Sequence, residues 1–323
     1  MGFLTKYGSF WGMLPMTVGN VHWVSPSSSY VVEGRTYSAS DNNDGLSPER
    51  ALATIAQAYT NATASAGDVI ALLPGTHAAA AAAHNKAGLT VIGLPFYPQT
   101  QVNDLTTGIY GPKAIITGVA SNSLVVTAAD AHFHNIKFLP ITQKTSVSFS
   151  AAATGLRFSR CLIDNTGVTG HANTKGVIAS AAADGVYFQG CVFKDSSVTT
   201  SCGPAVDLGA SKHFFFDKCI VYKDGSIASG IAWTTAIVIA DGCSGTFREL
   251  DYIGTEVSVG TTKVITAATL SGAGVVHGLR CTMTVNTGGL LFDDFAAADM
   301  DLCLNYVATV AGGSGGTLIS AST

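Results

Sequence analysis

Phe158-Ser-Arg-Cys161, Phe188-Gln-Gly-Cys191 and Phe216-Asp-Lys-Cys219 repeat one pattern, in which a phenylalanine precedes a cysteine by three positions. Other segments keep this spacing with substitutions at one or both ends: Phe133-His-Asn-Ile136, Phe247-Arg-Glu-Leu250, Gly278-Leu-Arg-Cys281 and Met300-Asp-Leu-Cys303. From Ile136 to Cys303, the last positions of successive segments are 22 to 31 residues apart. Self-similarity at an irregular period of this length is typical of a solenoid of stacked coils.

Each repeat has the composition of a short β-strand followed by a turn. Residues 186–193 (VYFQGCVF) are rich in β-branched and aromatic residues, and Gly, Asn, Asp, Ser and Thr follow the repeats. Helical patterns of about 10 to 15 residues are missing between them, which excludes a doubly wound α/β fold. The sequence therefore predicts an all-β parallel β-helix, in which the repeated cysteines stack as a buried, reduced ladder because free cysteine is small and buries readily.

A capping helix is predicted before the first coil. Ser47-Pro48-Glu49 offers an N-cap followed by proline at the first helical position. The residues that then mark one apolar face are Ala51, Leu52, Ile55, Ala58, Tyr59 and Ala62. We expect this helix to end at Gly67 and to cover the open end of the core, with the first full coil starting at residues 68–75.

Residues 44–55 (DGLSPERALATI) and 67–77 (GDVIALLPGTH) resemble the opening signature of right-handed parallel β-helix proteins of the pectate-lyase-like superfamily. The resemblance covers about 40 residues. It implies a right-handed, single-stranded parallel β-helix with an N-terminal capping α-helix and an extended N-terminal arm. It implies no particular activity, because lyases, hydrolases, phage tailspikes and noncatalytic virion proteins share this signature. We expect an arm over residues 1–36, the capped β-helix over residues 37–311 and a tail over residues 312–323.

Composition narrows the classes of partner. Charged residues make up 12% of the chain, and the net charge is −4 with no basic stripe, which argues against nucleic-acid binding. The most apolar run, residues 230–240, is far shorter than the ~20 residues that span a bilayer, so no membrane segment is expected. No nucleotide-binding fingerprint or cysteine pair at metal-ligand spacing is present, and we expect no cofactor and no metal.

Candidate catalytic groups are sparse. Asp293-Asp294 is the adjacent acidic pair within the coils, and Asp164, Asp195 and Asp224 follow repeated strands at similar offsets. These aspartates form either an acidic stripe or, as we favour, separate turns. Residues 41–45 (DNNDG) are similar to a calcium loop but lack its twelfth-position glutamate, which favours a turn before the capping helix. The histidines on or beside repeated strands, His132, His134, His213 and His277, have no ligand partner at zinc-site spacing.

The first 30 residues are unusually aromatic for a segment too short to have its own core. Their aromatic side chains are Phe3, Tyr7, Phe10, Trp11, Trp23 and Tyr30. They either dock on a partner or fold back on the chain's own β-helix. Residues 6–15 (KYGSFWGMLP) and 21–24 (VHWV) resemble the start of structural proteins of tailed bacteriophages. We take the six aromatic residues as the candidate contact with a particle or subunit.

Two functions follow from these observations. The first is a noncatalytic structural protein of a tailed-phage virion, assembled in the host cytoplasm. It would be a capsid decoration or cement protein, a homotrimer anchored on the major capsid protein or another virion protein by its arm. The second is a tailspike-like depolymerase or lyase that binds polysaccharide along a β-helix groove. Scarce charge and the missing catalytic cluster favour the first, whereas a cleft with aromatic residues and paired acids would favour the second.

Overall fold

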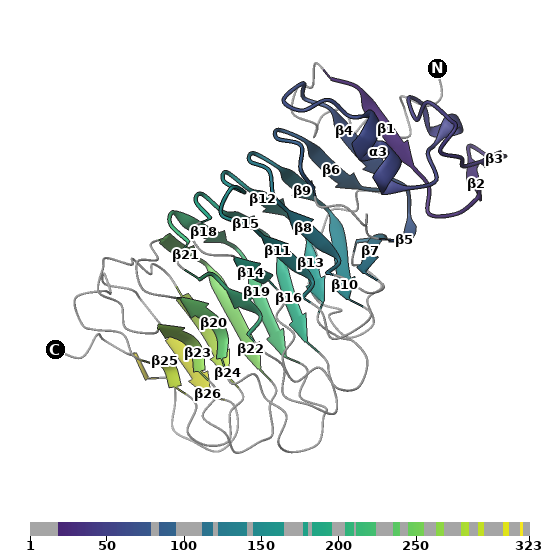
Figure 1. The fold of residues 1–323 in the computed structure, drawn as a ribbon. Coiled ribbons are helices and arrows are strands. Elements are labelled where there is room, and N and C mark those ends of the chain that lie inside the picture. The colour runs from purple at the N-terminus through teal and green to yellow at the C-terminus, as the bar shows by residue number, and fades with distance from the viewer. Residues whose placement is uncertain are drawn as a thin grey trace.

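The computed structural model describes residues 19–78, 84–94, 112–118, 122–140, 145–164, 177–179, 183–195, 204–209, 211–223, 235–239, 245–254, 263–267, 279–283, 290–293, 306–309 and 317–318. Within these residues the chain winds as a right-handed parallel β-helix whose coils follow one another from the N-terminal to the C-terminal end (Figure 1). Each full coil adds one strand to each of three sheets. The all-β solenoid predicted from the sequence is confirmed.

The three sheets run along the molecule. The eight-stranded sheet contains β1 (Val21–Val24), β4 (Val69–Leu72), β6 (Thr90–Gly93), β9 (His132–His134), β12 (Arg157–Ser159), β15 (Tyr187–Gln189), β18 (Phe214–Asp217) and β21 (Gly245–Arg248). The ten-stranded sheet contains β5 (Gly75–Ala78), β7 (Ala114–Gly118), β10 (Ile136–Pro140), β13 (Leu162–Asp164), β16 (Val192–Asp195), β19 (Ile220–Lys223), β22 (Leu250–Gly254), β24 (Leu279–Met283), β26 (Tyr306–Thr309) and β27 (Thr317–Leu318). The seven-stranded sheet contains β8 (Leu124–Val126), β11 (Val147–Phe149), β14 (Val177–Ala179), β17 (Val206–Asp207), β20 (Thr235–Ile239), β23 (Lys263–Ala267) and β25 (Leu290–Asp293).

A row of phenylalanine rings fills the core behind the eight-stranded sheet. Strand pairing aligns the first residues of the repeat, which are Phe133, Phe158, Phe188, Phe216 and Phe247. Their neighbouring ring centroids are 5.1, 5.1, 4.8 and 4.9 Å apart, and every one of these side chains is fully buried. Aromatic pairs at such distances add stability beyond the area that they bury, so this row fixes the register of five successive coils.

A second buried row follows three positions later in each coil. Its members are Ile136, Cys161, Cys191, Cys219 and Leu250. The thiol of Cys191 donates to the Phe158 carbonyl at 3.2 Å, and that of Cys219 donates to the Phe188 carbonyl at 3.3 Å. Burial raises the pKa of the Cys191 and Cys219 thiols well above its ordinary value. These cysteines are therefore protonated packing residues rather than reactive thiols.

The ladder continues past Leu250 with a different residue from the one predicted. Leu250 pairs with Leu279, and Tyr252 pairs with Cys281, so Cys281 lies two positions beyond the row. Leu279 therefore takes the position of the row in the strand register. The prediction that Cys281 occupies the ladder position is wrong. Cys303 lies outside the described residues.

A left-handed residue makes the corner between the two rows. Arg160, Gly190 and Lys218 have φ angles of 52°, 59° and 52°, and Asn135 and Glu249 occupy the same position with φ angles of 54° and 53°. The backbone N–H of Arg160 donates to the Gln189 carbonyl of the next coil at 2.8 Å, and the other coils repeat this bond. One turn residue at a fixed place explains why the two rows are always three positions apart.

The capped end differs in detail from the predicted helix. Pro48–Arg50 form a short 3-10 turn, η1, and the helix α3 covers only Ile55–Asn61. Between them the chain is extended, and Leu52 exchanges backbone hydrogen bonds with β1, donating to the Trp23 carbonyl at 2.8 Å. This pairing occupies the free edge of β1 and prevents a continuous helix. Thr54, not Ser47, is the residue whose side chain caps α3, by accepting a bond from the Gln57 N–H.

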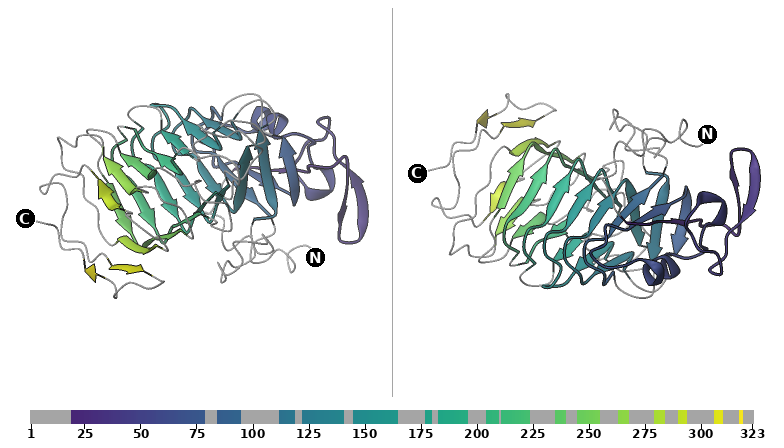
Figure 2. Two further views of the ribbon diagram at one scale, coloured as in Figure 1. Left: turned by 90° about the horizontal axis from the view of Figure 1, so that it is seen from below. Right: turned by 90° about the horizontal axis from the view of Figure 1, so that it is seen from above.

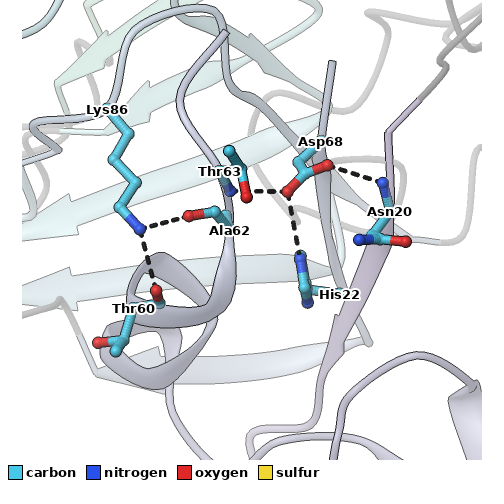
Figure 3. Close-up of polar contacts among 7 residues, drawn as sticks. All are labelled: Asn20, His22, Thr60, Ala62, Thr63, Asp68 and Lys86. Carbon is cyan, nitrogen blue, oxygen red and sulfur yellow. Dashed lines mark hydrogen bonds and ion pairs between the residues drawn. The ribbon is translucent and has the colours of Figure 1, made fainter. Parts of the chain in front are cut away.

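Two side chains join the cap to the first coils (Figure 3). The Asp68 carboxylate accepts bonds from the backbone N–H groups of Asn20 and Thr63, both at 2.7 Å, and lies 3.5 Å from His22. Burial alone would raise the pKa of Asp68, but these hydrogen bonds and His22 outweigh burial and lower it. Lys86 donates to carbonyls at the C-terminal end of α3. The start of β1 and the end of α3 are thus tied to the β-helix.

Replacing Phe188 by alanine tests the aromatic row. Phe188 is fully buried between Phe158 and Phe216, so Phe188→Ala leaves a cavity inside a rigid stack. We expect the free energy of unfolding to fall by about 3 to 5 kcal/mol in denaturant titrations followed by circular dichroism. Val31→Ala is the control, because Val31 is 66% exposed and its loss should change stability by less than about 0.5 kcal/mol. A loss below about 1 kcal/mol at Phe188 would contradict the proposed role of the stack.

Candidate functional site

The outer surface of the eight-stranded sheet carries the candidate site. Because alternate residues of a strand point to opposite faces, the residues flanking each buried phenylalanine point outward. Strand pairing aligns them in two columns along the molecule. The first column is His132, Arg157, Tyr187, Phe215 and Thr246, and the second is His134, Ser159, Gln189, Asp217 and Arg248.

Towards the capped end the same outer surface is closed. The outward side chains of β1, β4 and β6 belong to a second buried apolar cluster, which contains Trp23, Ala51, Val69, Ala71, Leu73, Ile92 and Leu94. Tyr30 packs against this cluster, and its hydroxyl accepts a bond from the Ala51 N–H at 3.0 Å. The open part of the face therefore starts at β9, where polar residues replace the apolar ones.

A cleft of about 190 Å³ lies on the open part of the face. Its lining comes from three neighbouring strands and consists of Arg157, Phe158, Ser159, Tyr187, Phe188, Gln189, Phe215 and Asp217. Tyr187 is 40% exposed, and its ring centroid is 6.1 Å from that of Phe215. The Arg157 guanidinium lies 5.6 Å from the Tyr187 centroid, and that of Arg248 lies 5.4 Å from the Phe215 centroid. The two aromatic rings, tilted by 53° to each other and each with a guanidinium over it, thus form what we call the aromatic platform.

An ion pair forms the polar wall of this cleft. Arg248 holds Asp217 through two contacts of 2.7 Å, one from Nε and one from a terminal nitrogen, and the Gln189 amide donates to the same carboxylate at 3.4 Å. The hydrogen bond from Arg248 lowers the pKa of Asp217, and its charge adds to this effect, although burial opposes it. Asp217 is therefore an ionised acceptor whose position is fixed by a bidentate partner.

Two neutral histidines lie at the other end of the open face. His132 Nε2 is 2.9 Å from Ser159 Oγ, and the His132 and His134 rings meet edge to face with centroids 6.0 Å apart. Burial, assisted by the Arg157 charge, lowers the pKa of His132 to about 4. Burial also lowers the pKa of His134 to about 4, with His132 and Arg160 contributing. Both rings are uncharged near neutral pH.

The acidic residues singled out in the sequence do not meet in one stripe. Asp164 pairs in register with Lys194, and Asp195 pairs with Lys223, so the two aspartates occupy different columns. Asp164 is buried and lies 2.8 Å from the Lys137 ammonium. Asp293 ends β25, whereas Asp224 and Asp294 lie outside the described residues. The possible acidic stripe is therefore wrong where the structure describes it. The favoured placement in turns is also wrong for Asp164 and Asp195, because each is the last residue of a strand.

The loop at residues 41–45 uses its polar groups within the cap. The Asp41 carboxylate accepts bonds from the backbone N–H groups of Ala53 and Thr54 and from the Thr54 hydroxyl. Asp44 lies 3.0 Å from the Arg50 guanidinium. This loop is the turn into the cap, as the sequence favoured. His213 lies 2.7 Å from Asp184, and His277 is outside the described residues; across the described part of the chain no three metal-ligand side chains cluster.

The predicted contact residues of the arm divide into two groups. Phe3, Tyr7, Phe10 and Trp11 lie outside the described residues, so their role stays a prediction. Trp23 lies in β1, within the eight-stranded sheet, and is 3% exposed; with Tyr30 it packs on the chain's own strands. Trp23 is therefore buried against the chain's own strands, whereas Tyr30 is only partly buried and its contact with a partner stays a prediction. The hairpin of β2 (Ser29–Val32) and β3 (Arg35–Ser38) crosses the expected boundary at residue 36 and projects from the capped end (Figure 2).

The cleft itself was not found from the sequence. Its signal was present: the residues on either side of each repeated phenylalanine include Arg157, Tyr187, Gln189, Asp217 and Arg248. However, the outward columns follow only from the register of strands that are about 30 residues apart in the sequence.

Among the described helices, none is long and apolar enough to cross a bilayer.

A second, much smaller cavity lies inside the capped end. It has a volume of about 10 Å³ and is lined by Ile55, Tyr59, His84, Ile116, Ser123, Leu124 and Val125. The His84 ring meets the edges of Tyr59 and Phe133, with centroids 5.0 and 5.2 Å away. Burial lowers the pKa of His84 to about 4, and a contact with the Lys86 backbone opposes this shift only in part. The fold therefore requires this ring to be neutral.

Acid should loosen the capped end through His84. The pKa of His84 is about 4 in the folded protein, whereas its ordinary value is 6.5. The unfolded chain therefore binds a proton on this imidazole more readily than the folded protein does. The stability contributed by neutral His84 is fully present above about pH 6.5 and falls as the pH drops to about 4, by at most roughly 3 kcal/mol. His84→Phe should flatten this part of the curve of unfolding free energy against pH. Equal pH dependence in both proteins would contradict the assignment.

Comparisons with known proteins agree on the fold. No protein-family model matches the chain, and no curated protein sequence matches it. Among solved structures, the pectate lyase Pel9A is similar with 11% identity and a TM-score of 0.52, over 90% of this chain and 80% of that one. A pectin methylesterase from carrot is similar with 12% identity and a TM-score of 0.50, over 92% of this chain and 86% of that one. The protein is thus a right-handed parallel β-helix that is similar in fold to these two enzymes, and at this identity the likeness establishes the fold alone.

Proposed function

We propose that this protein is a glycan-binding β-helix, and that the glycan lies along the open face of the eight-stranded sheet. The observation that carries the proposal is the cleft of about 190 Å³, which combines the Tyr187–Phe215 platform with the Asp217, Arg248 and Gln189 polar wall. A pyranose ring has an apolar C–H face and a rim of hydroxyl groups. It therefore suits a site with an aromatic floor and fixed charged hydrogen-bonding groups.

The direction of the columns also supports a chain-like ligand. Tyr187 and Phe215 come from adjacent coils, which follow one another at the strand spacing of about 4.8 Å. A polysaccharide running along the molecule would meet an equivalent position in every coil. The apolar cluster closes the face at the capped end, so such a chain would lie over β9 to β21.

Binding fits the cleft better than cleavage by two carboxylates. Hydrolysis of a glycoside usually requires one carboxyl group as an acid with a raised pKa and a second as a base or nucleophile. Asp217 is the single carboxylate that lines the described cleft, and Arg248 lowers its pKa. The names of the similar structures, pectate lyase and pectin methylesterase, agree with a carbohydrate ligand but assign no reaction to this chain.

Loss of the aromatic platform should weaken glycan binding. We would screen the full chain against immobilised polysaccharides and measure the affinity of the best binder by calorimetry. Tyr187→Ala should reduce this affinity by about fivefold, because a stacked ring contributes on the order of 1 kcal/mol beyond its buried area. Tyr37→Ala, in the projecting hairpin, is the matched control and should bind as the wild type does. Equal loss in both variants, or no binder in the panel, would overturn the proposal.

The setting that we propose is the surface of a tailed-phage particle. The support is the resemblance of residues 6–24 to phage structural proteins, together with a cleft that favours binding over carboxylate-pair cleavage. The protein would be a structural component, trimeric and attached to the major capsid protein or another virion protein. A glycan-binding face would let such a component hold a host surface.

Counting copies in purified source particles tests this setting. Quantitative mass spectrometry would compare this chain with the major capsid protein. We expect hundreds of copies per particle, as a decoration or cement protein would have. A handful of copies per particle would indicate a position in the tail and would overturn the proposed capsid position. Absence of the chain from the particles would overturn the virion setting.

A further inference from the structure

We infer that the small cavity inside the capped end is a binding site for one ordered water molecule, held between the His84 imidazole and the Ser123 hydroxyl. This inference does not depend on the proposed glycan-binding function. The site requires a small, uncharged ligand that both donates and accepts hydrogen bonds, because its polar groups are a neutral ring and a hydroxyl in a largely apolar wall. The water is part of the folded cap.

The first step is that polar atoms at this cavity have no partner in the chain. Neither ring nitrogen of His84 nor the Ser123 hydroxyl makes a hydrogen bond to a described residue, and both residues are 1% exposed. The contact of His84 with the Lys86 backbone does not have hydrogen-bond geometry. Native interiors pair most of their buried polar groups, and ordered water supplies the partner where the chain does not.

The second step is that the chain holds the His84 ring in place. The His84 N–H donates to the Val125 carbonyl at 2.7 Å, and the Thr127 N–H donates to the His84 carbonyl at 2.9 Å, so His84 pairs with the edge of β8. Its ring packs edge to face against Tyr59 and Phe133. The imidazole cannot turn toward a partner elsewhere without breaking this packing, so its partner has to lie in the cavity.

The third step is the size and composition of the cavity. A volume of about 10 Å³ corresponds to a single water, because a water site needs roughly 10 to 15 Å³ and polar partners on its wall. Apart from the Tyr59 hydroxyl, the rest of the lining side chains are apolar, so an ion bound here would lose its hydration without compensation. Water donates to a His84 nitrogen and shares a second hydrogen bond with the Ser123 hydroxyl. It thereby links the residue on the edge of β8 to the residue that precedes β8.

A crystal structure and a count of long-lived waters test the site. Crystals of the full chain grown near neutral pH should show one density peak within about 3.2 Å of both Ser123 Oγ and a His84 ring nitrogen. In solution, magnetic relaxation dispersion of the water signal should report one long-lived water fewer for Ser123→Ala than for the wild type. Ser25→Ala is the matched control and should leave the count unchanged, because Ser25 is also 1% exposed but its hydroxyl donates to the Ser27 carbonyl at 3.0 Å.

A double-mutant cycle separates a bridging water from a serine that acts alone. His84 and Ser123 share no direct hydrogen bond, so a water between them is what couples their polar groups. In denaturant titrations at neutral pH, we expect Ser123→Ala to lower the folding equilibrium constant about fivefold in the wild type and less than about twofold in the His84→Phe background. Absence of the density peak, an unchanged water count in Ser123→Ala, or equal effects of Ser123→Ala in both backgrounds would overturn the site.

Discussion

Stacking of equivalent residues in successive coils is the constraint on which this molecule depends. A coil buries its inward side chain only if the neighbouring coils present apolar side chains at the same height, as the phenylalanine row does. The neighbouring row of Ile136, the cysteines and Leu250 repeats this requirement. The left-handed corner residue joins the two rows, and its backbone N–H donates a hydrogen bond to a carbonyl of the next coil. Packing, turn and hydrogen bond therefore enforce one register together.

That register also creates the open face on which the candidate site lies. Once Phe158, Phe188 and Phe216 face inward, their flanking residues must face outward and align across strands. Tyr187 then meets Phe215, and Asp217 meets Arg248, although none of these pairs is close in sequence. From β9 to β21 the inward row is phenylalanine throughout, whereas the outward positions of the eight-stranded sheet vary from apolar at the capped end to cationic and ion-paired. The same scaffold thus supports a closed end and an open stretch, on which we propose that a glycan binds.

The closed end shows how a solenoid protects its first coil. The extended Leu52 segment pairs with the edge of β1, α3 covers the core, and Asp68 and Lys86 tie both to the first coils. Trp23 and Tyr30 contribute to this closure. The projecting hairpin is the described N-terminal feature that stands away from the sheets.

The sequence by itself determined the class of fold, because a repeated aromatic and cysteine spacing can be satisfied only by stacked coils. It also located the cap, though it overestimated the helix, since nothing local reveals that Leu52 pairs with β1. The tertiary structure alone decided that Leu279 rather than Cys281 continues the ladder, that the aspartates do not align, and that Arg157, Tyr187, Asp217 and Arg248 share one face. The physical reason is register: periodicity specifies that coils stack, but which residues become neighbours depends on where each strand pairs with the next.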